Sequence, residues 1–308
     1  MHLTRPLLSI SLPSSPPAQI ATKSSITPLT RRLFGLPTPP VPSTSLHNDL
    51  PSFLSYAKRT GLPEKSTTYQ GTLYEYIVQA HLRKSAFDLH RIGGRSDLGI
   101  DLTGTWHMGQ NPIIDPPVRV IVQCKALKSK IGPHVVRELE GVTARHFAVA
   151  SARGSGGGVG VLVSPRETSK GVREALGRSV MPLVCMMVER DGRVRQVLWN
   201  GRVEGLGLGG LGVEILYPNR GEIEGEMEAR LTWEGKGVQT MDQVEEGMRR
   251  LEEEWIVKWK DSGLGDVSVE EVLDAVEKVV PGTRPVSISK EEKEEVVKSL
   301  LSTRTARV

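Results

Sequence analysis

The segment 71–127 most constrains what this chain can fold into, because its apolar residues recur first at helical spacing and then in the alternation of strands. Glu75 lies within the helical pattern, and Asp101 lies in a short apolar run that reads as a strand. A further strand carries Gln123 and Lys125 between apolar neighbours. The segment therefore places chargeable or polar side chains inside three otherwise apolar elements.

Alternation along the last of these strands sends Gln123 and Lys125 to one face of the sheet and their apolar neighbours to the other. A single Asp or Lys in such a place is more often solvated than functional. Burying Asp101 and Lys125 together near an apolar sheet, however, costs several kcal/mol unless the two charges pair or bind a metal. A carboxylate, an amide and an ammonium on adjacent strands can hold a divalent metal and a water next to a phosphodiester.

The order of the predicted elements indicates an α/β protein. They are a helix at about 69–85, strands at about 87–92, 101–106 and 118–127, a helix at about 134–148, a strand at 159–163, a helix at 169–179 and a strand at 182–189. The run 159–163 is continuously apolar, as a central parallel strand would be, and the helix before it provides the crossover. We expect an αβββαβ core with a mixed sheet flanked by helices, followed by a C-terminal helical extension.

Composition divides the chain into four predicted parts. These are a targeting or disordered leader at 1–48, an α/β domain at 49–218, an acidic linker or insertion at 219–237 and a helical region at 238–308. The leader contains no Asp or Glu and is rich in Ser, Thr and Pro. Leaders that lack acidic residues and carry Arg favour import into the mitochondrial matrix, although an ordinary disordered tail would have a similar composition.

The net charge of +4 is unevenly distributed along the chain. Residues 49–180 carry a net charge of +7 and residues 181–308 a net charge of −7. The positive half contains the polar strands, which suits a partner that bears phosphate groups. The two cysteines, Cys124 and Cys185, are predicted to be buried free thiols. No apolar run reaches the roughly 18–20 residues that a membrane span needs.

Three helices are predicted at the C-terminus, because each of three apolar-periodic segments begins with a capping box. The boxes are Thr240 with Gln243, Ser268 with Glu271, and Ser289 with Glu292. The last two helices are candidates for binding a protein partner. The glycine-rich run 205–212 contains a G-x-G-x-x-G match, but a strand follows it instead of a helix, so we interpret it as a turn and not as a nucleotide site.

Three short motifs of the segment resemble the restriction-endonuclease-like, PD-(D/E)xK nuclease superfamily, and within it the Mrr-type branch. The motifs are Tyr74-Glu75 on the first helix, Asp97-Leu-Gly99-Ile-Asp101, and Gln123-Cys-Lys125. This resemblance covers about residues 68–165. The layout of the whole chain also resembles the fungal mitochondrial family called required for respiratory growth protein 7.

The nuclease resemblance implies metal-dependent phosphodiester hydrolysis, with Mg²⁺ or Mn²⁺ as the ion and DNA as the expected substrate. The implied catalytic residues are Glu75, Asp101, Gln123 and Lys125. Asp101, the Gln123 carbonyl and the backbone carbonyl of Cys124 would be the metal ligands. Backbone phosphates would be contacted by Arg91, Arg95, Lys128, Lys130 and Arg137.

Gln123 departs from the acidic residue that is commoner in the superfamily, so the sequence leaves open whether the chain is an enzyme. One alternative is a nucleic-acid-binding protein that supports mitochondrial genome maintenance on a nuclease-like scaffold without catalysis. Another is an interaction module that binds a protein through its acidic helical C-terminus. Many nuclease relatives act as dimers, which makes a homo-oligomer an expectation, but the sequence marks no dimer face.

Overall fold

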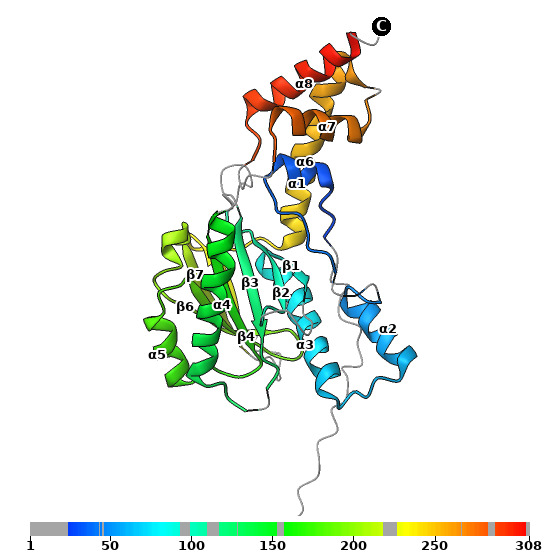
Figure 1. The fold of residues 1–308 in the computed structure, drawn as a ribbon. Helices are drawn as coiled ribbons and strands as arrows, with labels where there is room; N and C mark the ends of the chain where they lie inside the picture. Colours follow the sequence, from blue (N-terminus) through cyan, green and yellow to red (C-terminus); the bar gives the residue numbers. More distant parts are fainter. Residues whose placement is uncertain are drawn as a thin grey trace, which may run out of the picture.

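The computed structural model describes residues 24–42, 44, 46–92, 99–109, 117–127, 129–152, 157–217, 227–265, 267–282 and 287–305. Within them the predicted α/β class is confirmed: a mixed six-stranded sheet is flanked by helices, and further helices follow at the C-terminal end (Figure 1).

The six strands lie in the sheet in the order in which they occur in the chain. They are β1 (Phe87–Arg91), β2 (Leu102–Trp106), β3 (Val118–Cys124), β4 (Gly158–Ser164), β5 (Leu183–Val188) and β6 (Val194–Trp199). The first three are antiparallel, β3, β4 and β5 are parallel, and β6 is antiparallel to β5. The predicted element order helix, three strands, helix, strand is therefore present. Its assignment to the restriction-endonuclease-like fold stays a prediction.

Helices cover the two faces of this sheet differently. On one face α3 (Thr67–Leu82) packs Tyr74 and Val78 into a large core with Val120 and Val122 of β3. On the other face α4 (Pro133–Ala152) and α5 (Lys170–Arg178) supply the parallel crossovers and pack against β4 and β5. This division follows from the alternation of side chains along each strand.

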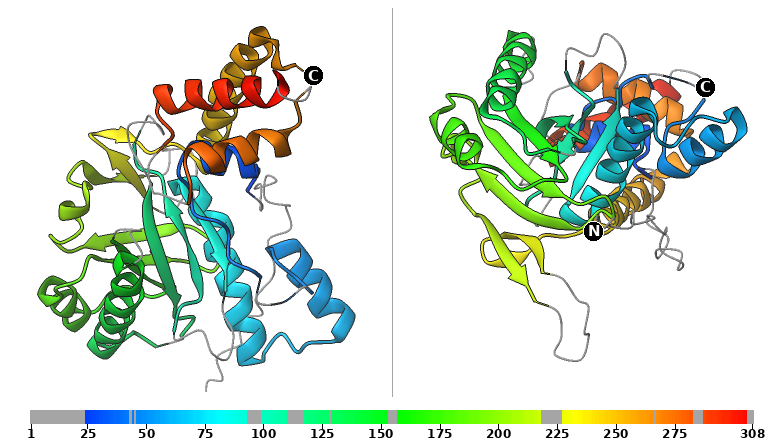
Figure 2. Two further views of the ribbon diagram at one scale, coloured as in Figure 1. Left: turned by 45° about the horizontal axis from the view of Figure 1, so that its top comes forward. Right: turned by 90° about the horizontal axis from the view of Figure 1, so that it is seen from below.

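A second, smaller sheet follows the first. It contains β7 (Leu211–Leu216), β8 (Glu228–Trp233) and β9 (Lys236–Gly237), and its buried residues Leu211, Ala229 and Leu231 join the core on the α3 side. Figure 2 shows this sheet as a yellow-green layer beside the main one. The segment predicted as an acidic linker or insertion at 219–237 therefore contains two strands from residue 228 onward, and Ala229 and Leu231 of β8 are buried.

Three helices at the C-terminus are confirmed, each with the capping box that the sequence predicts. They are α6 (Met241–Trp259), which continues into a short π-helical turn η3 (Lys260–Leu264), α7 (Val269–Val279) and α8 (Lys290–Thr305). None of the helices in the described part of the chain has the length and apolarity required to cross a bilayer. The glycine-rich run also forms the expected turn, with a short 3-10 helix η2 (Glu204–Leu206) before β7.

The N-terminal segment is part of this helical region. The short helix α1 (Pro28–Leu33) buries Leu29, Leu33 and Phe34 among apolar side chains of α6, α7 and α8, so the two ends of the described chain share one core (Figure 1). The leader predicted at 1–48 therefore differs from the structure from Ser24 onward. The segment is rich in Ser, Thr and Pro and lacks acidic residues, and this composition does not indicate that Leu29, Leu33 and Phe34 are buried against the C-terminal helices.

The remaining elements connect α1 to the main sheet. The helix α2 (Leu50–Thr60) begins with a capping box between Asp49 and Ser52, and it packs on α3. Ser66 caps α3, its side chain accepting a hydrogen bond from the backbone N–H of Tyr69. A short 3-10 helix η1 (Arg83–Ser85) then leads into β1.

Candidate functional site

Asp101 lies directly before β2, at the end of β3. Its backbone N–H donates to the carbonyl of Val122 over 2.9 Å. Its side-chain Oδ2 accepts a hydrogen bond from the backbone N–H of Cys124 over 2.6 Å. The carboxylate is therefore held against the last residue of the neighbouring strand by a charge-assisted hydrogen bond, which is stronger than a neutral one.

Gln123 and Lys125 share one partner on α4. The Gln123 Nε2 donates to Oε1 of Glu138 over 2.7 Å, and the Lys125 Nζ lies 3.3 Å from the same oxygen. Cys124, between them, packs against the core on the opposite face. The predicted alternation along β3 is therefore present, and the polar face of its end turns toward α4.

Sequence reasoning missed Glu138. A signal was available, since Glu138 follows Val135 by three residues and Val135 belongs to the apolar stripe that packs α4 on the sheet. An acid beside such a stripe lies near the edge of the buried face and can reach polar groups at the end of a strand. Lys125 and the Gln123 amide hold the pKa of Glu138 below its ordinary value, although partial burial acts in the opposite direction.

Glu75 lies on the other face of the sheet, where its Oε2 accepts a hydrogen bond from Nε of Arg91 over 2.5 Å. The two charges are mostly buried, and the Arg91 guanidinium also lies over the ring of Tyr76. Arg91 is thus an ion-pair partner of the predicted catalytic Glu75. The structure does not bring Glu75 into hydrogen-bond contact with Gln123 or Lys125, which face α4.

The Cys124 thiol lies among these charges. Burial raises its pKa well above the ordinary value, and the nearby carboxylates Asp101 and Glu75 raise it further, against the opposing effect of Arg91 and Lys125. The thiol therefore stays protonated at neutral pH and is unsuited to act as a thiolate nucleophile or thiolate metal ligand. Both cysteines are free, as predicted.

Gly99 is placed where only glycine fits. It adopts a left-handed backbone conformation with φ of 83°, and a Cβ at this position would lie 3.0 Å from Nε2 of Gln123. The glycine of the Asp97–Asp101 motif therefore leaves room for the Gln123 amide. Asp97 itself lies outside the described residues.

Gln123 is buried, and its Oε1 has no hydrogen-bond partner among the described residues. A buried amide oxygen without a partner costs about 1–3 kcal/mol, so such an atom calls for a ligand or a water. Together with the Asp101 carboxylate it offers oxygen donors of the kind that Mg²⁺ prefers. No group of three or more His, Cys, Asp or Glu side chains able to hold a metal occurs in the described part of the chain. The donors present fit a Mg²⁺ ion that keeps several waters, not an all-protein cage.

The predicted phosphate-contacting residues have different locations. Lys130 is exposed in the turn between β3 and α4, and Arg137 is exposed on the first half of α4. Arg95 and Lys128 lie outside the described residues. Lys130 and Arg137 are therefore exposed, and both follow the polar end of β3 in the sequence.

The chain thus presents an α/β scaffold with a polar group at the end of its third strand. The sequence model of the family described as "Required for respiratory growth protein 7" matches residues 66–117 and 110–217, which include the main sheet, α3 to α5, and the start of the second sheet. This match supports the family resemblance that the layout of the chain indicates.

Two curated relatives are similar to parts of this chain. An uncharacterized mitochondrial protein of Schizosaccharomyces pombe is 42% identical over 95 residues, which cover 31% of this chain and 38% of that protein. "Required for respiratory growth protein 7, mitochondrial" of Saccharomyces cerevisiae (strain ATCC 204508 / S288c) is 29% identical over an alignment that covers 45% of this chain and 72% of that protein. No solved structure matches the chain significantly.

Proposed function

We propose that this chain acts in mitochondria on nucleic acid, and that the polar end of β3 supports metal-assisted hydrolysis of a phosphodiester bond. Two observations at the end of β3 carry the proposal: a carboxylate held there by a backbone N–H, and a buried amide oxygen without a hydrogen-bond partner in the described part of the chain. Asp101 is held at Cys124, and Oε1 of the adjacent Gln123 has no hydrogen-bond partner among the described residues. The names of the relatives support the mitochondrial setting and a role in respiratory growth.

Asp101 and Gln123 would hold a Mg²⁺ or Mn²⁺ ion through hard oxygen atoms. When bound, such an ion would offset negative charge on the phosphate and lower the pKa of a bound water. Lys125 would orient the attacking water and stabilise negative charge that develops in the transition state. Glu138 would keep the Lys125 ammonium and the Gln123 amide in place, and Lys130 and Arg137 would contact neighbouring phosphates.

The test compares the full-length protein with its Asp101→Asn and Lys125→Met variants. Each is incubated with Mg²⁺ or Mn²⁺ and with linear DNA, branched DNA and RNA. Lys170→Met is the matched control, because it removes an exposed lysine of α5 that pairs with Glu174 and has no role in the proposed site. We expect cleavage by the wild type and a loss of 10²-fold or more in both site variants. Cleavage that Asp101→Asn and Lys125→Met leave unchanged would refute the assignment.

A second function is favoured by the pairing of Lys125 with Glu138. An ammonium already paired with a carboxylate, and a site in which Asp101 is the single acidic ligand proposed, suit a protein that binds nucleic acid without cutting it. This candidate predicts salt-dependent binding that persists in Asp101→Asn and needs no metal. A protein partner on α7 and α8 is the least supported reading, because their apolar faces are used in the shared helical core.

A further inference from the structure

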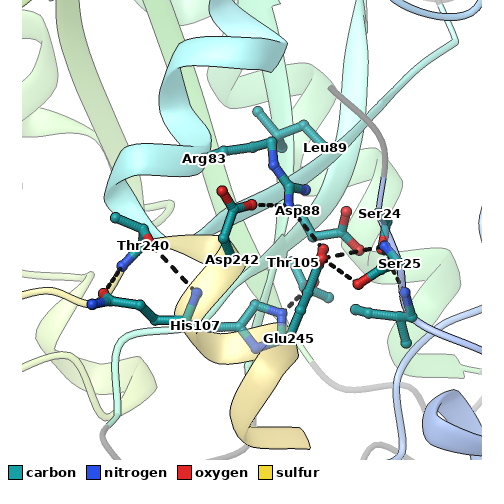
Figure 3. A network of polar contacts seen from close by, with 12 residues as sticks. Ser24, Ser25, Arg83, Asp88, Leu89, Thr105, His107, Thr240, Asp242 and Glu245 are labelled. Atoms are coloured by element: carbon teal, nitrogen blue, oxygen red, sulfur yellow. Dashed lines mark hydrogen bonds and ion pairs between the residues drawn. The ribbon is translucent and has the colours of Figure 1, made fainter. Parts of the chain in front are cut away.

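A cavity of about 330 Å³ lies between the N-terminal segment and the β1 edge of the main sheet. Its walls come from residues 24–48, from α3 and η1, and from β1. Figure 3 shows three of its lining residues, Ser24, Arg83 and Asp88, converging from these three parts of the chain. The volume is at the lower end of the range for small-molecule sites, so the cavity suits a compact ligand.

The charged groups that line the cavity are mostly cationic. They comprise the guanidinium groups of Arg31, Arg83 and Arg91 and a single carboxylate, that of Asp88. The acids that pair with Arg83 and Arg91 lie on α6 and α3, and they are not among the residues that line the cavity. His47 also lines the cavity. Its pKa is lowered mainly by burial and to a smaller extent by the positive charge of Arg91. The cavity therefore favours an anion.

The Arg31 guanidinium is only partly satisfied by the protein, because Nη1 donates to the Pro37 carbonyl over 3.0 Å but Nη2 has only long contacts. Its Nη2 lies 3.4 Å from Oδ2 of Asp88 and 3.5 Å from Oγ of Ser24. A charge-assisted contact between guanidinium and carboxylate is ordinarily about 2.7–2.9 Å long. The end of this side chain is only 12% exposed, so bulk water does not supply the missing contacts. A small oxyanion in the cavity would supply them.

Four lining side chains also carry a buried polar atom without a hydrogen-bond partner among the described residues. These atoms are Gln79 Oε1, Asp88 Oδ1, Arg83 Nε and His90 Nε2. Buried polar atoms are nearly always satisfied by protein, ligand or water, and here four unsatisfied ones belong to residues that line one cavity. The first two are acceptors, which a bare phosphate ion does not satisfy. A ligand that combines an oxyanion with hydroxyl or amino donors satisfies both kinds.

We propose that this cavity binds a sugar phosphate group, with its phosphate at Arg31 and its hydroxyl groups toward Asp88 and Gln79. The same chemistry is offered by a free sugar phosphate or mononucleotide and by the 5′-phosphorylated end of a nucleic-acid strand. Only the second source rests on the proposed function. Arg91 lines the cavity and pairs with Glu75 of α3.

Binding to the full-length protein is measured by titration calorimetry with ribose 5-phosphate, ribose and inorganic phosphate. We expect ribose 5-phosphate to bind at least tenfold more tightly than ribose or phosphate alone. Arg31→Gln should weaken that binding tenfold or more, and Arg31→Lys, which keeps the charge, should weaken it less. The matched control is Arg32→Gln, because Arg32 follows on the same helix but pairs with Glu277 and does not line the cavity.

Equal binding of ribose and ribose 5-phosphate, no binding of either, or the same affinity in Arg31→Gln and Arg32→Gln would each overturn the proposal. Oligonucleotides with a 5′-phosphate or a 5′-hydroxyl end then distinguish the two sources. A preference for the phosphorylated end that Arg31→Gln abolishes assigns the site to strand ends. Equal binding of the two ends, with ribose 5-phosphate still bound, assigns the cavity to a free ligand, and the function proposed for the end of β3 is then decided by the cleavage assay alone.

Discussion

Replacing Leu33 by Ala should destabilise the C-terminal helices, although Leu33 lies at the other end of the sequence. Leu33 is 1% exposed and belongs to the cluster formed by α1 with α6, α7 and α8. Its carbonyl also accepts a hydrogen bond from the N–H of Ile288 over 2.9 Å. The substitution removes three buried carbon atoms from this cluster and leaves a cavity between four helices.

The expected loss in the free energy of unfolding is about 3–5 kcal/mol, the range for Leu→Ala at fully buried positions. This is a large fraction of the roughly 5–15 kcal/mol that stabilises an ordinary domain. Val41→Ala is the matched control, because Val41 belongs to the same N-terminal segment and is 88% exposed. Its effect should stay within about 0.5 kcal/mol.

Urea unfolding of the full-length protein measures the loss, and hydrogen exchange locates it. Amides of α6, α7 and α8 should lose protection in Leu33→Ala, whereas those of β3 and β4 should change less. Tryptophan fluorescence reports the same region, since Trp255 and Trp259 lie in the cluster. If Leu33→Ala and Val41→Ala have the same small effect, the N-terminal segment is not part of the helical core and the reasoning is refuted.

Three further results are expected. Arg83→Ala should cost about 3–5 kcal/mol in thermal or urea unfolding, because it leaves the buried Glu245 carboxylate without its cation; a cost below 1 kcal/mol would contradict this. Burial lowers the pKa of His107 from 6.5 to about 4, so on acidification the unfolded chain takes up a proton at His107 before the folded chain does. The free energy of unfolding should therefore fall by about 3 kcal/mol between about pH 6.5 and pH 4. His107→Gln should remove that part of the pH dependence, and the same dependence of unfolding free energy on pH in wild type and variant would contradict the prediction. Ser268→Ala should cost about 1 kcal/mol through loss of the α7 cap, whereas Ser262→Ala should cost less, and circular dichroism melts compare the two.

The elements that the sequence predicts best are those whose signals are local. The capping boxes at Thr240, Ser268 and Ser289 require only residues three positions apart, and all three are present. The alternation of polar and apolar residues in β3 was equally predictable, because successive side chains of a strand point to opposite faces of the sheet. The order of helices and strands up to β5 follows from the same kinds of signal.

The errors involve contacts between distant parts of the chain. The leader predicted up to residue 48 includes Leu29 and Leu33, which gain their burial from helices more than 200 residues later. The insertion predicted at 219–237 includes Leu231, whose partners lie in the main core. In both segments, composition described the exposed residues and did not show where the few apolar side chains would be buried.

The candidate site was predicted in part. Gln123 and Lys125 lie on one face as expected, and Asp101 lies beside the end of the same strand. Glu75, predicted as a catalytic residue on the neighbouring helix, pairs with Arg91 on the α3 side of the sheet, whereas Glu138 contacts Gln123 and Lys125 from α4. A linear motif indicates which strand carries a side chain, but the choice of helix that reaches it depends on tertiary packing.

The central claim is that Asp101 and the Gln123 amide oxygen form one oxygen-donor site at the end of β3. Anomalous diffraction from crystals of the full-length protein soaked in Mn²⁺ tests it most directly. The account predicts a Mn²⁺ peak within about 2.0–2.3 Å of an Asp101 oxygen and of Oε1 of Gln123. A peak at other residues only, or crystals in which Mn²⁺ binds nowhere near these two side chains, would contradict it.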